Sequence, residues 1–233
     1  MKRVVRFIKI LLLAASLVMI NVLPAKASLW DAPVDPGDYT GSRTSASGGG
    51  VYATQSWDNG GFTISWDITN NNDGTLTYKY TLTGEKKSIS HFILELSGDI
   101  EGDIFDGSDP YQGPASWGPG HGNSNPGFPE GAAIYGIKFE FGGSPVTYTL
   151  VTNRLPVWGN FYAKDGKESG DFLFAYNNAL ALTGFNSDVE NDFIARPNSI
   201  VPLPGSMVLF GTALVGLLVY GRGKFKPQRY RLL

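Results

Sequence analysis

The chain has 233 residues, with 19 lysine and arginine residues, 21 aspartate and glutamate residues and no cysteine. All 21 acidic residues but only nine of the basic ones lie between residues 28 and 200, so this segment carries a net charge of −12. Nucleic acid is excluded as a partner, because phosphate binding requires a basic surface. The absence of cysteine excludes a disulfide-stabilised fold and cysteine-ligated zinc.

Residues 1–27 have the three parts of a secretory signal peptide. Four of the first nine residues are lysine or arginine, and an apolar run that we expect to be helical follows from Ile10 to Val22. Ala25 and Ala27 then supply the small residues that signal peptidase recognises. We therefore predict cleavage after Ala27 and export of the acidic segment.

Residues 51–196 carry the pattern of a β-sheet protein. In Phe62–Thr69 and again in Thr75–Thr83 every second residue is apolar, and the turn residues Asn70–Gly74 separate the two runs, which predicts a hairpin with one buried face. Further strands are predicted at Val51–Trp57, Ser90–Ser97, Ala133–Phe141, Pro145–Thr152, Val157–Lys164, Gly170–Tyr176 and Asp192–Arg196. We expect an all-β, antiparallel two-sheet sandwich of the jelly-roll or immunoglobulin-like type, preceded by a flexible Gly/Ser-rich segment at residues 28–50.

Residues 99–131 interrupt this pattern. Eight of these 33 residues are glycine and five are proline, so we expect a long loop without regular structure. Loops of this length inside a compact domain are usually functional or disordered. The loop is therefore the first place to search for a site.

A group of carboxylates opens the loop. Five of them stand within 11 residues: Asp99, Glu101, Asp103, Asp106 and Asp109. Clustered carboxylates repel one another unless a hard cation such as calcium, which takes roughly six to eight oxygen ligands, lies among them. Their spacing is not that of an EF-hand, so the loop is either a calcium site of another kind or a solvated acidic loop. No other cofactor is expected.

Aromatic side chains occupy the second half of the loop. Tyr111, Trp117 and Phe128 lie among glycine, asparagine and serine, with His121 between them. Aromatic faces stack on the apolar faces of sugars, and amides supply directional hydrogen bonds. The loop could therefore bind a glycan, or its aromatic rings could pin it to the sandwich.

A glycoside hydrolase is a third possibility for this region. Glu95, Asp99 and Glu101 are similar to the acidic strand of jelly-roll glucanases, in which two carboxyl groups act together. Ser97 stands where that pattern requires a glutamate. We therefore expect no enzyme.

The chain ends in a membrane-delivery segment. A proline-containing spacer at residues 197–206 leads into an apolar run at 207–221, which we predict to be a transmembrane helix, and a basic cytoplasmic tail follows at 222–233. Bases beside an apolar segment stay on the cytoplasmic side. Both ends of the chain therefore start inside, and the acidic middle is exported.

This tail resembles the PEP-CTERM sorting signal of Gram-negative bacteria, with Pro-Leu-Pro in place of Pro-Glu-Pro. The residues that carry the resemblance are Val201, Pro202, Leu203, Pro204, Gly205, Ser206, Arg222 and Lys224. The resemblance covers the tail only. It implies recognition by an exosortase, cleavage near Pro202–Gly205 and release or transfer linked to exopolysaccharide export. Without cleavage, the protein would stay anchored in the inner membrane by its C-terminus.

The sequence therefore predicts a non-catalytic protein of the cell envelope, outer surface or extracellular matrix that is associated with exopolysaccharide or biofilm. Its expected partners are signal peptidase, an exosortase-like enzyme, the inner membrane at least transiently, and exopolysaccharide. The alternative is a carbohydrate-binding module, with or without calcium, that uses the loop at residues 99–131.

Overall fold

The computed structural model describes residues 28–98, 103–119 and 125–198, and in these residues the fold is all-β, without an α-helix. The strands are β1 (Thr40–Thr44), β2 (Val51–Ala53), β3 (Phe62–Asn70), β4 (Leu76–Gly84), β5 (His91–Glu95), β6 (Gln112–Trp117), β7 (Ile134–Phe139), β8 (Val146–Thr152), β9 (Pro156–Gly159), β10 (Phe161–Glu168), β11 (Asp171–Asn177) and β12 (Ile194–Pro197). Short 3-10 helices lie at Pro36–Asp38, Gln55–Trp57, Asn178–Ala181, Thr183–Phe185 and Glu190–Asp192.

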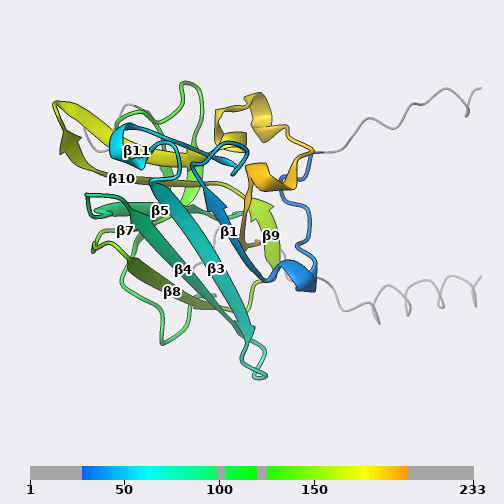
Figure 1. The fold of residues 1–233 in the computed structure, drawn as a ribbon. Coiled ribbons are helices and arrows are strands. Elements are labelled where there is room, and N and C mark those ends of the chain that lie inside the picture. The colour runs from blue at the N-terminus through cyan, green and yellow to red at the C-terminus, as the bar shows by residue number, and fades with distance from the viewer. Residues whose placement is uncertain (1–27, 99–102, 120–124, 199–233) are drawn as a thin grey trace, which may run out of the picture.

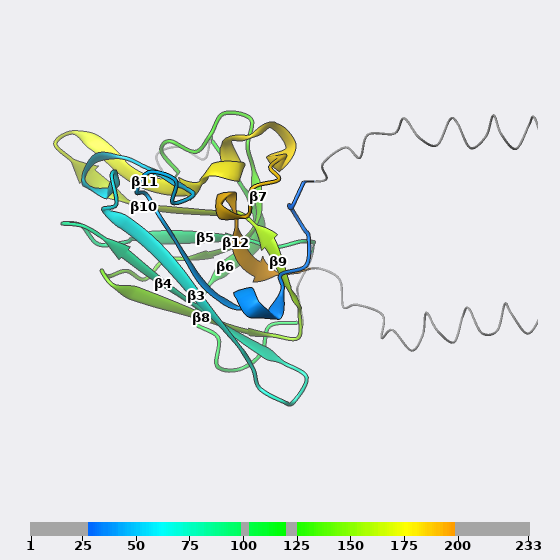
Figure 2. The ribbon, with the colours of Figure 1, turned by 45° about the vertical axis from the view of Figure 1, so that its right-hand side comes forward.

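The strands form two main antiparallel sheets, as expected for a sandwich. One sheet has four strands in the order β1-β3-β4-β8, and the other has six in the order β2-β11-β10-β5-β7-β6. A small third sheet pairs β12 with β9 at one end of the molecule. Figure 1 and Figure 2 show the four-stranded sheet lying across the six-stranded one, with β9 beside the end of both. The two-sheet architecture is confirmed, whereas the jelly-roll or immunoglobulin-like type stays a prediction.

Aromatic side chains fill the space between the two sheets. The ring of Phe92 on β5 packs on Tyr80 and Tyr148 of the opposite sheet, with centroids 5.6 and 5.2 Å apart, and Phe161 on β10 stacks on Phe62 of β3 at 6.0 Å. All five side chains are fully buried. Burial of each contributes about 1.5–3 kcal/mol, which is how a chain without disulfides stabilises its fold.

The central hairpin is confirmed. β3 and β4 pair in one unbroken register from Phe62 opposite Gly84 to Asn70 opposite Leu76, and the alternate apolar residues point into the core. The other predicted strands at residues 90–97, 133–141, 145–152, 170–176 and 192–196 are also present, with ends shifted by one or two residues. Periodicity of two is thus a reliable guide wherever one face of a strand is buried.

Two segments that we expected to lie outside regular structure contain strands. Residues 28–50 are not a flexible leader, because β1 pairs with β3 along its whole length and Val34 is buried in the core. The loop at residues 99–131 contains β6, which pairs with β7 at the edge of the six-stranded sheet. Both expectations were wrong because these strands are polar and glycine-containing, and pairing with a neighbour stabilises them.

Two predicted strands have other limits. The run Val51–Trp57 is a strand only as far as Ala53, because the chain then turns into a 3-10 helix that buries Trp57. The run Val157–Lys164 is divided at Asn160 into β9 and β10, which belong to different sheets. Asn160 is fully buried, and its side chain forms hydrogen bonds with the side chains of Glu95 and Asn177.

The first described residues form a strap along β9. Asp31 and Val34 donate backbone hydrogen bonds to carbonyls of β9, and Trp158 of β9 donates to Ala32. β12 pairs with the other edge of β9. The beginning and the end of the described chain therefore lie together at one end of the sandwich, on the two sides of the same strand (Figure 2).

A second segment, residues 104–109, lies along the free edge of β8. Phe105 and Asp109 donate their backbone N–H groups to carbonyls of Val151 and Thr149. The Asp109 carboxylate accepts the N–H of Thr149 at 2.7 Å, and the hydroxyl of Ser108 accepts that of Val151 at 2.8 Å. The outward polar groups of these two β8 residues are thus all satisfied by this segment.

Within the described ranges, no helix is both long and apolar enough to cross a membrane. The predicted signal helix, the transmembrane helix at 207–221 and the basic tail at 222–233 lie outside them.

Candidate functional site

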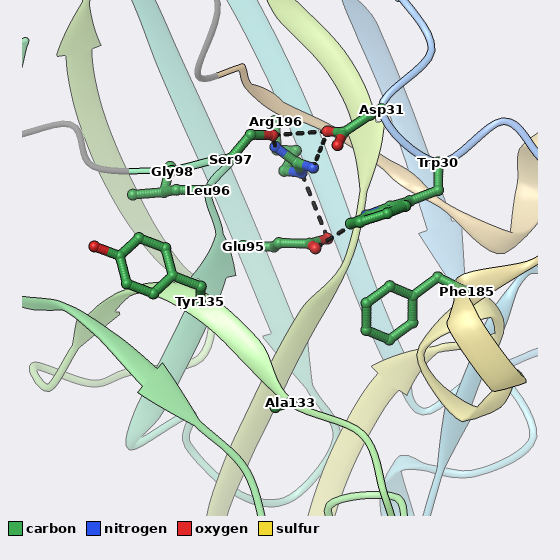
Figure 3. Close-up of a pocket in the computed structure, with 10 residues that line it drawn as sticks. All are labelled: Trp30, Asp31, Glu95, Leu96, Ser97, Gly98, Ala133, Tyr135, Phe185 and Arg196. Atoms are coloured by element: carbon green, nitrogen blue, oxygen red, sulfur yellow. Dashed lines mark hydrogen bonds and ion pairs between the residues drawn. The ribbon is translucent and has the colours of Figure 1, made fainter.

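A cleft lies at the end of the sandwich where the strap, β5, β7 and β12 meet. Its volume is about 600 Å³, in the usual range for a site that binds a small ligand. It is lined by Trp30, Asp31, Glu95, Leu96, Ser97, Gly98, Ala133, Tyr135, Phe185 and Arg196. Figure 3 shows Tyr135 on one side, Trp30 and Phe185 on the other, and Glu95 between them.

The guanidinium group of Arg196 organises the floor of the cleft. Arg196 is fully buried. It donates hydrogen bonds to the Asp31 carboxylate, the Ser97 hydroxyl and the Pro197 carbonyl, and its Nε lies 3.5 Å from Oε2 of Glu95. A buried cation is tolerated when carboxylates compensate its charge, and here two carboxylates do so.

Glu95 is fixed as firmly as Arg196. Its side chain is only 4% exposed. Oε1 accepts the indole N–H of Trp30 at 3.0 Å, and Oε2 accepts both the backbone and the side-chain N–H groups of Asn160 at 2.6 and 2.8 Å. Both carboxylate oxygens are therefore held by groups from distant parts of the chain.

The break between β9 and β10 makes this floor possible. Gly159 ends β9 directly beneath Arg196, and a Cβ at this position would lie 1.9 Å from Nε of the guanidinium. Only glycine leaves room for that side chain. The next residue, Asn160, then reaches Glu95 and also accepts a hydrogen bond from Asn177 at 2.8 Å.

Three aromatic rings form the walls of the cleft. Trp30 and Tyr135 are each 38% exposed, and Phe185 is partly buried. The Phe185 ring meets the Trp30 ring edge to face, with centroids 5.4 Å apart. Partly exposed rings above a floor of fixed polar groups can hold a ligand that has both apolar faces and hydroxyl groups.

A second cavity adjoins the cleft. It has a volume of about 440 Å³ and shares Ala133 and Phe185 with the cleft. Its other lining residues are Glu130, Gly131, Ala132, Leu180, Ala181, Leu182, Thr183 and Gly184. We call the cleft and this second cavity together the groove.

The carboxylates predicted to bind calcium are not brought together where the structure describes them. Asp103 forms an ion pair with Arg154 at 2.5 Å, Asp109 accepts a backbone N–H of β8, and Asp106 is exposed. Asp99 and Glu101 lie outside the described residues. Among the described residues no three His, Cys, Asp or Glu side chains are grouped as metal ligands. The calcium site stays a prediction.

The aromatic residues predicted to bind a glycan do not form one exposed surface in the structure. Phe128 is 5% exposed and packs on Tyr162 with centroids 5.0 Å apart, so its ring pins the loop and does not face a ligand. The Trp117 indole donates to the carbonyl of Gly136 at 2.9 Å and lies against Lys138. Phe128 is therefore withdrawn as a ligand residue, because burial makes its faces inaccessible.

Tyr111 alone of the described aromatic candidates lines a cavity. This smaller cavity, of about 290 Å³, also contains Lys138 and Glu140, which form an ion pair at 2.6 Å. His91 lies 3.5 Å from Glu140, and its pKa is lowered by burial and by the nearby ammonium groups of Lys164 and Lys138. Beyond Tyr111 and Phe141 this cavity offers no aromatic wall.

Several predicted site residues lie outside the described residues. These are His121 and the glucanase-like carboxylates Asp99 and Glu101, the cleavage residues Ala25 and Ala27, and the sorting residues Val201, Pro202, Leu203, Pro204, Gly205, Ser206, Arg222 and Lys224. Glu95 is described, and its surroundings are those of a structural carboxylate.

Sequence reasoning missed most of the groove. Trp30, Tyr135, Phe185 and Arg196 come from four separate segments, and none stands in a motif. One signal was available, since a tryptophan three residues after a predicted cleavage site is unusual in a segment expected to be a flexible leader.

Comparison with known proteins adds nothing to these contacts. The chain matches no family model, and searches of curated proteins and of solved structures found no match. The function must therefore be inferred from the chemistry of the groove together with the targeting segments of the sequence.

Proposed function

We propose that the chain is an exported, non-catalytic protein of the cell envelope or extracellular matrix that holds an exopolysaccharide chain in its groove. The observation that carries the proposal is the combination of three partly exposed aromatic rings with a rigid polar floor. Sugars present apolar C–H faces, which suit the aromatic rings, and hydroxyl groups, which the exposed side chains of Asp31 and Tyr135 can bond.

The rigidity of the floor supports binding. The Arg196 guanidinium and the Glu95 carboxylate are each held by at least three partners, so the site is formed before a ligand arrives. Pre-organised sites lose little conformational entropy on binding. Because both oxygens of Glu95 already accept hydrogen bonds, its role in the proposal is to position Trp30 and Arg196, and not to transfer protons.

Export is supported by the sequence. The charge asymmetry favours an orientation with the acidic segment outside and the basic ends inside, and the tail resembles a signal that directs proteins into polysaccharide export. The proposed ligand site is the groove, which contains only Glu130 and Gly131 of the loop at residues 99–131, because Phe128 is buried and Trp117 is fixed against β7.

The test is glycan binding by the full chain, purified in a mild detergent. Immobilised α-glucan, β-glucan, galactan and mannan oligosaccharides serve as probes. We expect Trp30→Ala to weaken binding at least about tenfold, because loss of the buried contact with an aromatic side chain costs about 1.5–3 kcal/mol. Tyr52→Ala is the matched control, because Tyr52 is 49% exposed and lies on β2, at the far edge of the six-stranded sheet.

Tyr111→Ala separates the two candidate surfaces. If Tyr111→Ala abolishes binding and Trp30→Ala does not, the ligand lies at the smaller cavity and the groove is not the site. Failure of every probe to bind the unaltered protein would overturn the proposed function.

A further inference from the structure

We infer that the groove selects a glycan chain without acidic groups and excludes uronate-containing or sulfated chains. This inference rests on the proposed function and adds the class of ligand. It follows from the charges that line the groove, from the partners of its one cation and from its length.

The charged residues of the groove are predominantly acidic. Among its described lining residues there are three carboxylates, Asp31, Glu95 and Glu130, and one cation, Arg196. Asp31 and Glu130 are exposed, whereas Arg196 and Glu95 are buried. A ligand in the groove therefore meets a net negative charge.

The one cation is not accessible to an acidic ligand, because its guanidinium group is fully buried. Nη1 and Nη2 of Arg196 donate to Ser97, Pro197 and Asp31, and Nε faces Glu95 at 3.5 Å. Proteins that bind carboxylate or sulfate groups present a free guanidinium fork or ammonium group. Here the fork is fully buried and turned toward the protein's own carboxylates.

The exposed carboxylates suit neutral sugars. An ionised carboxylate only accepts hydrogen bonds, and each sugar hydroxyl can donate one. The same carboxylates repel the carboxylate of a uronate, and like charges brought together at an interface cost several kcal/mol. One set of groups thus favours hydroxyl-bearing chains and disfavours acidic ones.

The length of the groove points to a chain and not a single sugar. The cleft and the second cavity share Ala133 and Phe185 among their lining residues. Leu182, 42% exposed, and Glu130 line the second cavity. A ligand that occupies both cavities would contact Phe185 and would need more than one sugar unit.

The experiment compares matched pairs of oligosaccharides on the full chain. Each neutral probe that binds is tested beside its C6-oxidised form, in which carboxylates replace the primary alcohols on the same backbone. At low ionic strength we expect the oxidised form to bind at least about tenfold more weakly. In about 0.5 M salt the difference should shrink, because the Debye length falls below the size of the groove.

Two variants localise the effect. Glu130→Gln should narrow the difference between neutral and oxidised probes, whereas Glu85→Gln, an exposed carboxylate outside the groove, should leave it unchanged. Sugar hexamers should bind more tightly than dimers of the same sugar. Leu182→Ala should reduce this difference in affinity.

Equal or tighter binding of the oxidised probes at low ionic strength would overturn the inference while leaving the proposed function intact, provided that Trp30→Ala still weakens the binding. If neither neutral nor oxidised probes bind, the proposed function fails and the inference fails with it.

Discussion

Arg196 is the residue that joins the two ends of the described chain. It lies on the last strand, yet it donates to Asp31 in the strap and faces Glu95 on β5. Removing one partner of a buried ion pair leaves an uncompensated charge, which is strongly destabilising. If Arg196 is removed, water can still solvate the exposed Asp31 carboxylate. Most of the loss of stability would therefore come from the buried Glu95 carboxylate, which would be left without a cation.

We therefore expect Arg196→Met to lower the free energy of unfolding by about 3–5 kcal/mol, as measured by urea denaturation. Lys79→Met, at an exposed position of β4, is the matched control and should change it by less than about 0.5 kcal/mol. The same Arg196→Met change in a Glu95→Gln background should cost clearly less. If Arg196→Met lowered the free energy of unfolding equally in both backgrounds, the charge of Glu95 would not be stabilised by Arg196.

At the scale of single residues, the sequence does not reveal the groove. Trp30 and Glu95 are 65 positions apart, and Asp31 and Arg196 are 165 apart. Neither pair has a spacing that local geometry could connect. The sequence draws attention to Glu95 as an acidic residue. Its partners Trp30 and Arg196 cannot be predicted, because they approach it only when the strap and β12 lie on the two sides of β9.

At the scale of the elements, the division between β9 and β10 is the feature on which the site depends. The apolar run from Val157 to Lys164 predicts one strand, because nothing in the alternation marks Asn160 as a break. The hairpin of β3 and β4, in contrast, could be predicted completely, because its alternation and its turn residues agree.

The strands that escaped prediction share a physical reason. β1 buries Arg43 and not an apolar residue, with the guanidinium over the rings of Trp66 and Trp158 at 4.9 and 5.6 Å. β6 contains a glycine and a proline. Their strand structure comes from neighbours across the sheet, and single-sequence patterns do not contain that information.

Gly159→Ala tests the importance of the break between β9 and β10. The added methyl group would collide with the Arg196 side chain, which is enclosed and has no room to move, so we expect a loss of about 1–3 kcal/mol of stability. Gly166→Ala is the matched control, because a Cβ at Gly166 of β10 meets nothing within 4 Å. Thermal denaturation measures the effect of both substitutions. Equal melting temperatures for the two variants would contradict the packing described for Arg196.

At the scale of the whole molecule, the groove lies at the end where the described chain begins and ends. Ser28 donates its hydroxyl hydrogen to the carbonyl of Phe185 at 3.0 Å, and Asn198 donates its backbone N–H to Leu155. The predicted cleavage after Ala27 falls immediately before these contacts. The site we propose therefore lies at the same end of the molecule as the first and the last described residues.

Mass spectrometry of the secreted protein tests the targeting part of the proposal. We expect an N-terminus at Ser28 and, in the presence of exosortase, a C-terminus near Pro202–Gly205. In a strain without exosortase the chain should end at Leu233. A C-terminus at Leu233 in both strains would mean a permanent anchor, and an intact Met1 would contradict export by a cleaved signal peptide.

The segment that covers β8 has a consequence for how copies of the protein behave when crowded. An uncovered strand edge invites a strand from another molecule, and proteins avoid the resulting aggregation by blocking such edges. Here Ser108 and Asp109 occupy the outward N–H groups of Thr149 and Val151. These two polar residues thus block the edge of this sheet, so we do not expect crowded copies of the protein to pair with one another along β8.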